Sequence, residues 1–418
     1  MLKVTRITDP VLAGIVDEEL DRQEHNIEMI ASESTVPVPV MELSGSVFTN
    51  KTLEGYPGSR FQAGSHIADK MEKLAIERAK AVYGAEYANI QSYSGSTANY
   101  SVYATILNPK DKVLSMRLDQ GGHLSHGSPA NWMSKFYNFD FYPINPETEY
   151  IDYEALQIKA KEMKPKLIIA GASSYSRIID YERIAAVAKE VGAYFMVDMA
   201  HIAGLVAAKV LPSPIPYADF VTSSTTKTFC GARAGMVFCK EQYGKKLDKG
   251  TFPGALGSIH CNTMAAKAWS FKYVASEEFR QIMLQVVKNA QALAQELTNR
   301  GFRIVSGGTD NHLLVADLRN KGITGKVFQN ALDYVGITVN KNMIPFDPET
   351  PFVTSGVRIG LTAVTQRGLK EPEIKEIAEI MEKVANNCDD PSNLDACKAR
   401  ARALIANFPL YPAGTFDD

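Results

Sequence analysis

The fold class is indicated most clearly by three successive segments: KLIIAG (Lys166–Gly171), YERIAAVAKEVG (Tyr181–Gly192) and YFMV (Tyr194–Val197). The first has an all-apolar centre, which is typical of a strand buried on both faces of a sheet. The second has the spacing of an amphipathic helix and ends in glycine, and the third is another buried strand. A further strand is expected at Phe220–Ser223. Strands that alternate with helices predict parallel βαβ units and an α/β fold with a mainly parallel, doubly covered sheet.

The alternation of strands and helices extends toward the N-terminus as far as about residue 70. The first ~30 residues are expected to form a helical arm. Helices are expected at Asp69–Tyr83 and Ser96–Leu107, and strands at Ala88–Gln91 and Asp111–Leu114. These segments belong to the same large domain as the central block.

The pattern changes after about residue 265. Ala265–Arg300 is expected to form one long helix, and shorter strands and two more helices follow it. The expected strands are Arg303–Val305, His312–Asp317 and Val357–Leu361, and the helices are Glu371–Asn387 and Ala396–Ala406. A chain of 418 residues exceeds the size at which a single core stops growing. We therefore expect an N-terminal arm and large domain in residues 1–275 and a smaller α+β domain in residues 276–418.

Composition narrows the class of protein. A formal net charge of −2, with 45% apolar and 22% charged residues, gives no reason to expect nucleic acid or an anionic membrane as a partner. The five cysteines are odd in number and form no C-x-x-C pair, which argues against a disulfide framework or a zinc knuckle. The N-terminal stretch lacks the apolar core of a signal peptide, and no apolar run is long enough to span a bilayer. A cytoplasmic enzyme without a metal site is the resulting expectation.

The first candidate for a functional site is Ser94-Gly95-Ser96, which comes after the expected strand Ala88–Gln91 and begins the expected helix Ser96–Leu107. Glycine lets the backbone approach an anion closely, and the hydroxyls and N–H groups at a helix start can hold a phosphate. Such a tripeptide is more often an ordinary helix cap, so taken alone it leaves both interpretations open.

The second candidate is the segment VDMAH, which contains Asp198 and His201 and lies at the carboxyl end of a buried strand. Ligands of open α/β sheets bind there. A carboxylate in this place can pair with a protonated ring nitrogen, which a pyridinium cofactor needs in order to act as an electron sink. A helix-capping aspartate is the competing interpretation.

The third candidate is Lys227, which follows a strand and a run of hydroxyl side chains that includes Ser224. Schiff-base chemistry needs a lysine that can be neutral and that lies in a pocket with phosphate partners nearby. A solvated loop lysine is the alternative.

Taken together, these three motifs resemble fold-type I pyridoxal-phosphate enzymes in their order and spacing. The resemblance implies an aspartate-aminotransferase-like fold, a pyridoxal 5'-phosphate cofactor, Lys227 as the Schiff-base lysine and Asp198 as the partner of the pyridine nitrogen.

Nearly the whole chain resembles serine hydroxymethyltransferase. The matching segments are IEMIASES (27–34), LEGYPGSR (53–60), GGHLSHGSP (121–129), YSRIIDY (175–181), VDMAHIAGLVAA (197–208), SGGTDNHL (306–313), TVNKN (338–342) and PFVTSGVRIG (351–360).

This resemblance implies roles for individual residues. The cofactor phosphate and ring would be contacted by Ser94, Gly95, Ser96, His123, Ser224 and Gly257, the last from a neighbouring subunit. Ser173 and His201 would contact the cofactor's phenolic oxygen or the substrate. The substrate would be bound by Ser32, Thr52, Gln62 and Arg358, with Arg358 clamping its carboxylate. Glu54 would carry the proton at the substrate hydroxyl, and the catalytic residues would be Lys227, Glu54, His123, Asp198 and His201. Tetrahydrofolate would be contacted by Leu118, Gly121, Gly122, Leu124, Phe252 and Asn342.

Without the family, three of these residues have plainer interpretations. His123 could be a core or turn histidine, Arg358 a structural ion-pair arginine, and Glu54 an ordinary loop carboxylate.

The sequence departs from the family around the expected site. Thr52 and Gln62 replace two tyrosines, and Thr226 replaces the histidine beside the lysine. These replacements remove bulk and alter hydrogen bonding around the substrate, and the loss of a buried polar partner shifts specificity strongly.

Two hypotheses about the reaction follow. The resemblance implies a homodimer with shared active sites that interconverts serine, or a related β-hydroxy amino acid, and glycine in one-carbon metabolism, with tetrahydrofolate as acceptor. The departures leave open a folate-independent aldolase or transaldolase acting on threonine-like or α-methylserine-like amino acids. A non-catalytic paralogue and an aminotransferase are the more distant alternatives.

Overall fold

The computed structural model describes residues 3–415. They divide into two compact units, Val36–Leu284 and the described residues of Met1–Thr35 and Gln285–Asp418. The division falls inside helix α11 (Glu277–Asn299). The N-terminal arm thus groups with the C-terminal part of the chain and not with the large domain, where it was expected, because strand β1 (Ile27–Glu28) pairs in parallel with β13 (Ile337–Thr338).

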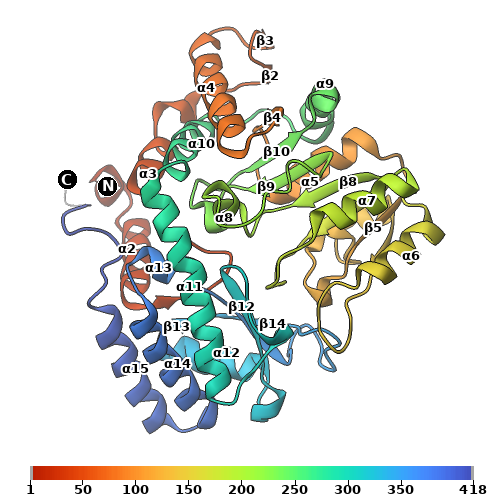
Figure 1. Cartoon of the computed structure of the whole chain (residues 1–418). Coiled ribbons are helices and arrows are strands. Elements are labelled where there is room, and N and C mark those ends of the chain that lie inside the picture. The colour runs from red at the N-terminus through yellow and green to blue at the C-terminus, as the bar shows by residue number, and fades with distance from the viewer. Residues whose placement is uncertain (1–2, 416–418) are drawn as a thin grey trace. The chain divides into compact units, whose positions relative to one another are not determined.

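The Val36–Leu284 unit is built on a seven-stranded sheet (Figure 1). Strands β5 to β9 are parallel, and β10 joins β9 to β4 by antiparallel pairing on both sides. In sheet order, the strands are β4 (Tyr87–Asn89), β10 (Gly235–Cys239), β9 (Phe220–Ser224), β8 (Tyr194–Asp198), β7 (Leu167–Gly171), β5 (Lys112–Met116) and β6 (Asn138–Tyr142). The predicted α/β fold with a mainly parallel sheet is confirmed.

Both faces of the sheet are buried, as the apolar strands predicted. Helix α5 (Gly95–Ile106) packs against β9 and β10, and its Val102 shares a buried cluster with Leu167 of β7. The next residue of that strand, Ile168, points to the opposite face and is also fully buried. Helix α7 (Tyr181–Val191) packs against β7 and β8.

One expected helix is wrong. Ala265–Arg300 does not form a single helix, because the chain breaks between α10 (Cys261–Val274) and α11. Ser276 supplies the break, since its hydroxyl accepts a hydrogen bond of 3.2 Å from the backbone N–H of Phe279. A serine in this place caps the start of a new helix, and the two glutamates that follow are stabilised by the helix dipole.

The remaining elements of this unit surround the sheet. Strands β6 and β10 were not expected from the sequence. The helices are α3 (Val38–Ser44), α4 (His66–Tyr83), α6 (Tyr153–Met163), α8 (Ala203–Ala207) and α9 (Gly244–Lys249), and β2 (Gly55–Tyr56) and β3 (Ser59–Arg60) form a short hairpin.

The other unit has α+β character. Its antiparallel sheet contains, in order, β11 (Arg303–Ile304), β12 (Leu313–Asp317), β15 (Gly356–Gly360) and β14 (Asn340–Asn342). Helices α12, α14 and α15 pack against one another beside it (Figure 1). Besides the part of α11 from Gln285 onward, the α-helices of this unit are α1 (Lys3–Thr8), α2 (Pro10–His25), α12 (Gly325–Val335), α13 (Thr362–Gln366), α14 (Glu371–Asn386) and α15 (Pro391–Ile405).

Helix α15 begins earlier than the expected Ala396, because Asp390 caps it by accepting the N–H of Ser392 at 3.0 Å. No helix within residues 3–415 is both long enough and apolar enough to cross a bilayer.

Candidate active site

The predicted cofactor residues of the Val36–Leu284 unit gather where strands of the large sheet end. Asp198 is the last residue of β8, and Ser224 is the last residue of the adjacent parallel strand β9. Ser94 is the N-cap of α5, which packs against β9. These three elements therefore bring the carboxylate, the hydroxyl run and the helix start to the same edge, where ligands of α/β sheets bind.

Asp198 is the centre of a buried hydrogen-bond network. Its Oδ2 accepts from Nδ2 of Asn99 at 2.9 Å and from Nε2 of His126 at 3.0 Å. Its Oδ1 accepts from the backbone N–H of Ala200 at 3.0 Å. Asn99 is oriented in turn by the hydroxyl of Thr222, which donates to its Oδ1 at 2.6 Å. A carboxylate with three donors is fixed in orientation and ready to receive a further positive group.

The network keeps this carboxyl ionised. Burial alone would raise the pKa of Asp198, but the hydrogen bond and charge of His126, with smaller contributions from His123 and Asn99, outweigh it and hold the pKa below its usual value. A buried negative charge of this kind is suited to pairing with a protonated ring nitrogen.

His123 belongs to the same cluster. Its Nδ1 accepts from the backbone N–H of Ser125 at 3.1 Å and lies 2.7 Å from the Ser125 hydroxyl, so a neutral ring carries its proton on Nε2. Its ring meets that of His126 edge to face, with the centroids 5.4 Å apart. The donor atoms of His123, His126 and Asp198 lie within 4.8 Å of one another. This spacing is compatible with a metal ion, but His126 Nε2 is already engaged with the carboxylate of Asp198.

Lys227 begins a 3-10 turn, η5 (Lys227–Phe229), just beyond β9. Its φ of 37° is left-handed, a conformation that costs a residue with a side chain about 1–3 kcal/mol and that clusters at functional sites. Its Nζ lies 3.5 Å from the Ser224 hydroxyl. Thr228 fastens the turn to the loop after β8, because its hydroxyl donates to the carbonyl of His201 at 2.8 Å. The Lys227 turn and the Asp198 loop are thus directly connected.

Ser94 is a helix cap in this structure. Its hydroxyl accepts from the N–H of Thr97 at 3.2 Å, and the Thr97 hydroxyl accepts from the N–H of Ser94 at 2.8 Å. The loop is closely packed, since a Cβ on Gly235 would lie 2.1 Å from the Ser94 carbonyl oxygen and one on Gly95 would lie 3.4 Å from the Ser224 Cβ. The plainer interpretation as a cap is thus correct, and it leaves the other first-turn N–H groups of α5 available to an anion.

A second group of predicted residues lies around the β2–β3 hairpin. Glu54 and Gln62 are hydrogen-bonded to each other on either side of it. The backbone N–H of Leu53 donates to Oγ of Ser258 at 3.2 Å, so Gly257 and Thr52 lie on neighbouring stretches of chain. Both are exposed, which allows contact with another molecule.

The predicted residues of the loops after β5 and β7 lie close together. The backbone N–H of Ser173 donates to the carbonyl of Gly121 at 2.7 Å. Leu118 and Leu124 are exposed, and Gly122 is buried.

Three predicted residues, Ser32, Asn342 and Arg358, belong to the other compact unit. Arg358 lies in the middle of β15, and its Nε donates to Oδ1 of Asn340 at 3.1 Å. Burial lowers the pKa of its guanidinium to about 10. The hydrogen-bond acceptor of the Arg358 Nε is thus an amide oxygen.

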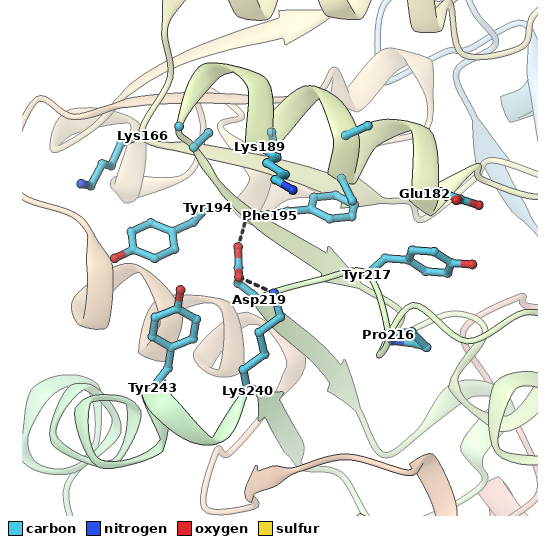
Figure 2. Close-up of a pocket in the computed structure, with 15 residues that line it drawn as sticks. Lys166, Glu182, Lys189, Tyr194, Phe195, Pro216, Tyr217, Asp219, Lys240 and Tyr243 are labelled. Carbon is cyan, nitrogen blue, oxygen red and sulfur yellow. Dashed lines mark hydrogen bonds and ion pairs between the residues drawn. The ribbon is translucent and has the colours of Figure 1, made fainter.

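A pocket of about 600 Å³ lies elsewhere in the large unit. Figure 2 shows that it is formed around Tyr194 at the start of β8, with Asp219 between Lys240 and the backbone N–H of Phe195. It therefore lies at the opposite ends of the strands from Asp198, and its lining contains no predicted site residue.

A family model described as serine hydroxymethyltransferase matches residues 5–381. The chain belongs to this family. Members of the family are pyridoxal-phosphate-dependent enzymes that catalyse hydroxymethyl transfer, and the chain is an enzyme of this type with a fold-type I architecture.

The donor set fits pyridoxal phosphate. The ionised, buried carboxylate of Asp198 suits a protonated pyridine nitrogen, the N-terminus of α5 suits a phosphate, and Lys227 lies in the turn that follows β9, the strand next to that of Asp198.

Two functional residues were not predicted from the sequence, namely Asn99 and His126, whose side chains hold Asp198. His126 stands in the quoted segment GGHLSHGSP, and Asn99 lies one turn into the helix that opens at Gly95. An amide facing inward at the start of that helix was a signal that could have indicated a partner for a carboxylate on a neighbouring strand.

Proposed function

We propose that this protein interconverts serine, or a closely related β-hydroxy amino acid, and glycine, with tetrahydrofolate as the one-carbon acceptor. The observation that carries the proposal is the buried, ionised Asp198 with its Asn99 and His126 donors, in a chain of the serine hydroxymethyltransferase family. Folate use, the roles of the individual residues, the homodimer and a cytoplasmic location are parts of the proposal.

The cofactor would be held by Lys227 through its amine and by Asp198 at the ring nitrogen, with the His123 ring stacked on it. When bound, the pyridinium ring takes up the electron pair released as the bond between Cα and Cβ breaks. The phosphate would be held at the start of α5 and by a neighbouring subunit, and the phenolic oxygen by residues of two loops. These contacts would come from Ser94, Gly95, Ser96, Ser173, His201, Ser224 and Gly257.

The substrate would be oriented by its carboxylate, which Arg358 and Ser32 would bind. A guanidinium offers two parallel donors in the geometry of a carboxylate. Holding the breaking bond in a single orientation contributes several kcal/mol in enzymes that rely on positioning, with about 7–11 kcal/mol as the upper range. The Glu54 carboxylate would take the proton from the β-hydroxyl as the aldehyde fragment leaves.

Tetrahydrofolate would bind next to the loops that carry Leu118, Gly121, Gly122 and Leu124, together with Phe252 and Asn342. The exposure of Leu118 and Leu124 supports this proposal, since apolar side chains open to solvent are suited to a flat aromatic ligand.

A folate-independent aldolase or transaldolase is the second candidate. It is favoured by Thr52, Gln62 and Thr226, which stand where the family has two tyrosines and a histidine. A less aromatic pocket suits a bulkier amino acid, such as threonine or an α-methylated serine.

The test is product analysis of the purified, pyridoxal-phosphate-loaded protein with serine, threonine and α-methylserine, each with and without tetrahydrofolate. Glycine formed from serine only with folate supports the first candidate. Glycine formed equally without folate, glycine formed only from threonine, or alanine released from α-methylserine supports the second. A keto-acid product from any of the three would overturn both.

A further inference from the structure

Gln62 binds Glu54 at two points. The backbone N–H of Glu54 donates to Oε1 of Gln62 at 2.8 Å, and Nε2 of Gln62 donates to Oε2 of Glu54 at 2.9 Å. The two bonds define the orientation of the amide, because the flipped side chain would place donor against donor and acceptor against acceptor. One side chain thus holds both the backbone and the carboxylate of the same residue.

The segment that carries this pair is itself held firmly. Gln62 and Glu54 flank the β2–β3 hairpin, and the backbone N–H of Phe61 donates to the carbonyl of Glu54 at 3.3 Å. Arg60 joins the hairpin to helix α4 through its ion pair with Asp69 at 2.8 Å. The Ser65 hydroxyl donates to the carbonyl of Gln62 at 2.6 Å. Because the Gln62 backbone is anchored, its amide is a fixed reference for the carboxylate.

The hydrogen bond from Gln62 uses one of the two carboxylate oxygens of Glu54. Both Glu54 and Gln62 are half-buried. Among the residues that the structure describes, Gln62 supplies the hydrogen bond to the Glu54 side chain, and it uses Oε2. The other oxygen, Oε1, can therefore accept a proton from an incoming hydroxyl while Oε2 stays in place.

We propose that Gln62 is a positioning residue that fixes the Glu54 carboxylate for proton transfer and acts on the reaction through Glu54. This inference rests on the proposed function. It also assigns Gln62 a role different from the expected direct contact with the substrate, because both polar groups of its amide are directed at Glu54.

The experiment is a double-mutant cycle in the full-length, cofactor-loaded protein with its best amino acid substrate. The variants are Gln62→Met, which keeps length and volume without hydrogen bonds, Glu54→Ala, and the two combined. We expect Gln62→Met to lower kcat by about 10- to 100-fold, the range for lost hydrogen bonds that position a reacting group, with a small change in KM. In the Glu54→Ala background the same substitution should change kcat by less than about twofold, because residues that act as a unit are not additive.

The matched control is Gln157→Met. Gln157 donates from Nε2 to the carboxylate of Glu190 at 2.8 Å between α6 and α7, outside the site. It loses the same kind of bond and should leave kcat unchanged.

A second cycle measures unfolding by denaturant in the cofactor-free protein, and it needs no turnover. Coupling between the two positions there, together with the kinetic coupling, supports the inference. Equal kcat losses from Gln62→Met with and without Glu54, or a loss that appears in KM alone, would overturn it in favour of direct substrate contact. If the wild-type protein turns over no amino acid, the proposed function is wrong, and the role of Gln62 in it is wrong too. If the wild-type protein is active and Gln62→Met has the same turnover, only the inference about Gln62 is wrong.

Discussion

Replacing Asp198 with asparagine tests the centre of the site, because the change removes one charge and almost no volume. The carboxylate accepts on Oδ2 from Asn99 and His126 and on Oδ1 from the Ala200 backbone. An amide can accept with only one of its two polar atoms. In either orientation, its NH₂ group faces a donor, so at least one buried donor loses its acceptor.

The structure sets the size of the effect. A buried donor left without an acceptor costs about 1–3 kcal/mol, and we expect a loss of this size in the free energy of unfolding of the cofactor-free Asp198→Asn protein at neutral pH. Cofactor binding should suffer more, because removing one partner of a buried charge pair costs about 2–5 kcal/mol, or roughly 30- to several thousand-fold in affinity. Turnover per bound cofactor should fall as well, since the ring nitrogen loses its counter-charge.

The pH dependence follows from the lowered pKa of Asp198. A carboxyl whose folded-state pKa lies below its ordinary value stabilises the protein above that ordinary value, and the contribution is lost as the pH falls toward the folded-state pKa. The stability difference between wild type and Asp198→Asn should therefore be constant from about pH 8 to pH 5 and shrink below about pH 4.

The assay is denaturant unfolding with and without pyridoxal phosphate, alongside a cofactor titration. Asp219→Asn is the matched control, since Asp219 accepts from Lys240 and the Phe195 backbone at the other ends of the same strands. It should leave cofactor affinity unchanged. An Asp198→Asn protein that unfolds at the wild-type midpoint and binds the cofactor equally well would show that the Asp198 carboxylate is not needed for either property.

Three further predictions concern the framework. Burial lowers the pKa of Lys267 from 10.5 to about 7, so between these pH values the unfolded chain binds one more proton than the folded protein. As the pH rises from 7.5 to 9.5, the free energy of unfolding of wild type should therefore increase by up to about 1.4 kcal/mol per pH unit relative to Lys267→Met, measured by denaturant unfolding. Gly235→Ala would place a Cβ 2.1 Å from the Ser94 carbonyl oxygen, so it should weaken binding of pyridoxal phosphate at least tenfold and lower Tm, whereas Gly14→Ala, with open space around it, should not. Ser276→Ala removes the cap of α11 and should cost about 1 kcal/mol in unfolding free energy.

Each of these predictions has a contrary result. If the difference in unfolding free energy between wild type and Lys267→Met does not change with pH, the buried amine is still protonated at pH 9.5. Wild-type cofactor affinity in Gly235→Ala would show that the Ser94 loop can shift without loss. An unchanged Tm in Ser276→Ala would mean that tertiary packing alone separates α10 from α11.

The local pattern of apolar residues was sufficient to predict those elements whose structure depends on that pattern alone. The apolar centre of Lys166–Gly171 predicted β7, and all five residues of that strand are buried. The same reasoning failed for Ala265–Arg300, because apolar spacing continues through Ser276 and only a side-chain cap ends one helix there and starts another. Strand β10 was also missed; it pairs with the preceding strand β9, but its place at the centre of an antiparallel triple also depends on β4, which is distant in the sequence.

The site divides in the same way. Lys227 and Asp198 could be identified because each lies at or just beyond the carboxyl end of a buried strand, which is a place that the pattern predicts. Asn99 and His126 acquire their importance only when α5 and the loop after β5 meet the end of β8. The bond between Gln62 and Glu54 likewise depends on the hairpin that brings them together.

The central claim is that Lys227 holds the cofactor. The most direct test is borohydride reduction of the pyridoxal-phosphate-loaded protein, which fixes the cofactor covalently to the lysine that holds it, followed by mass-spectrometric mapping of the labelled peptide. We expect a single label on Lys227, which is absent from the Lys227→Ala variant. A label on another lysine, above all the buried Lys267 with its lowered pKa, or an undiminished label in Lys227→Ala, would contradict it.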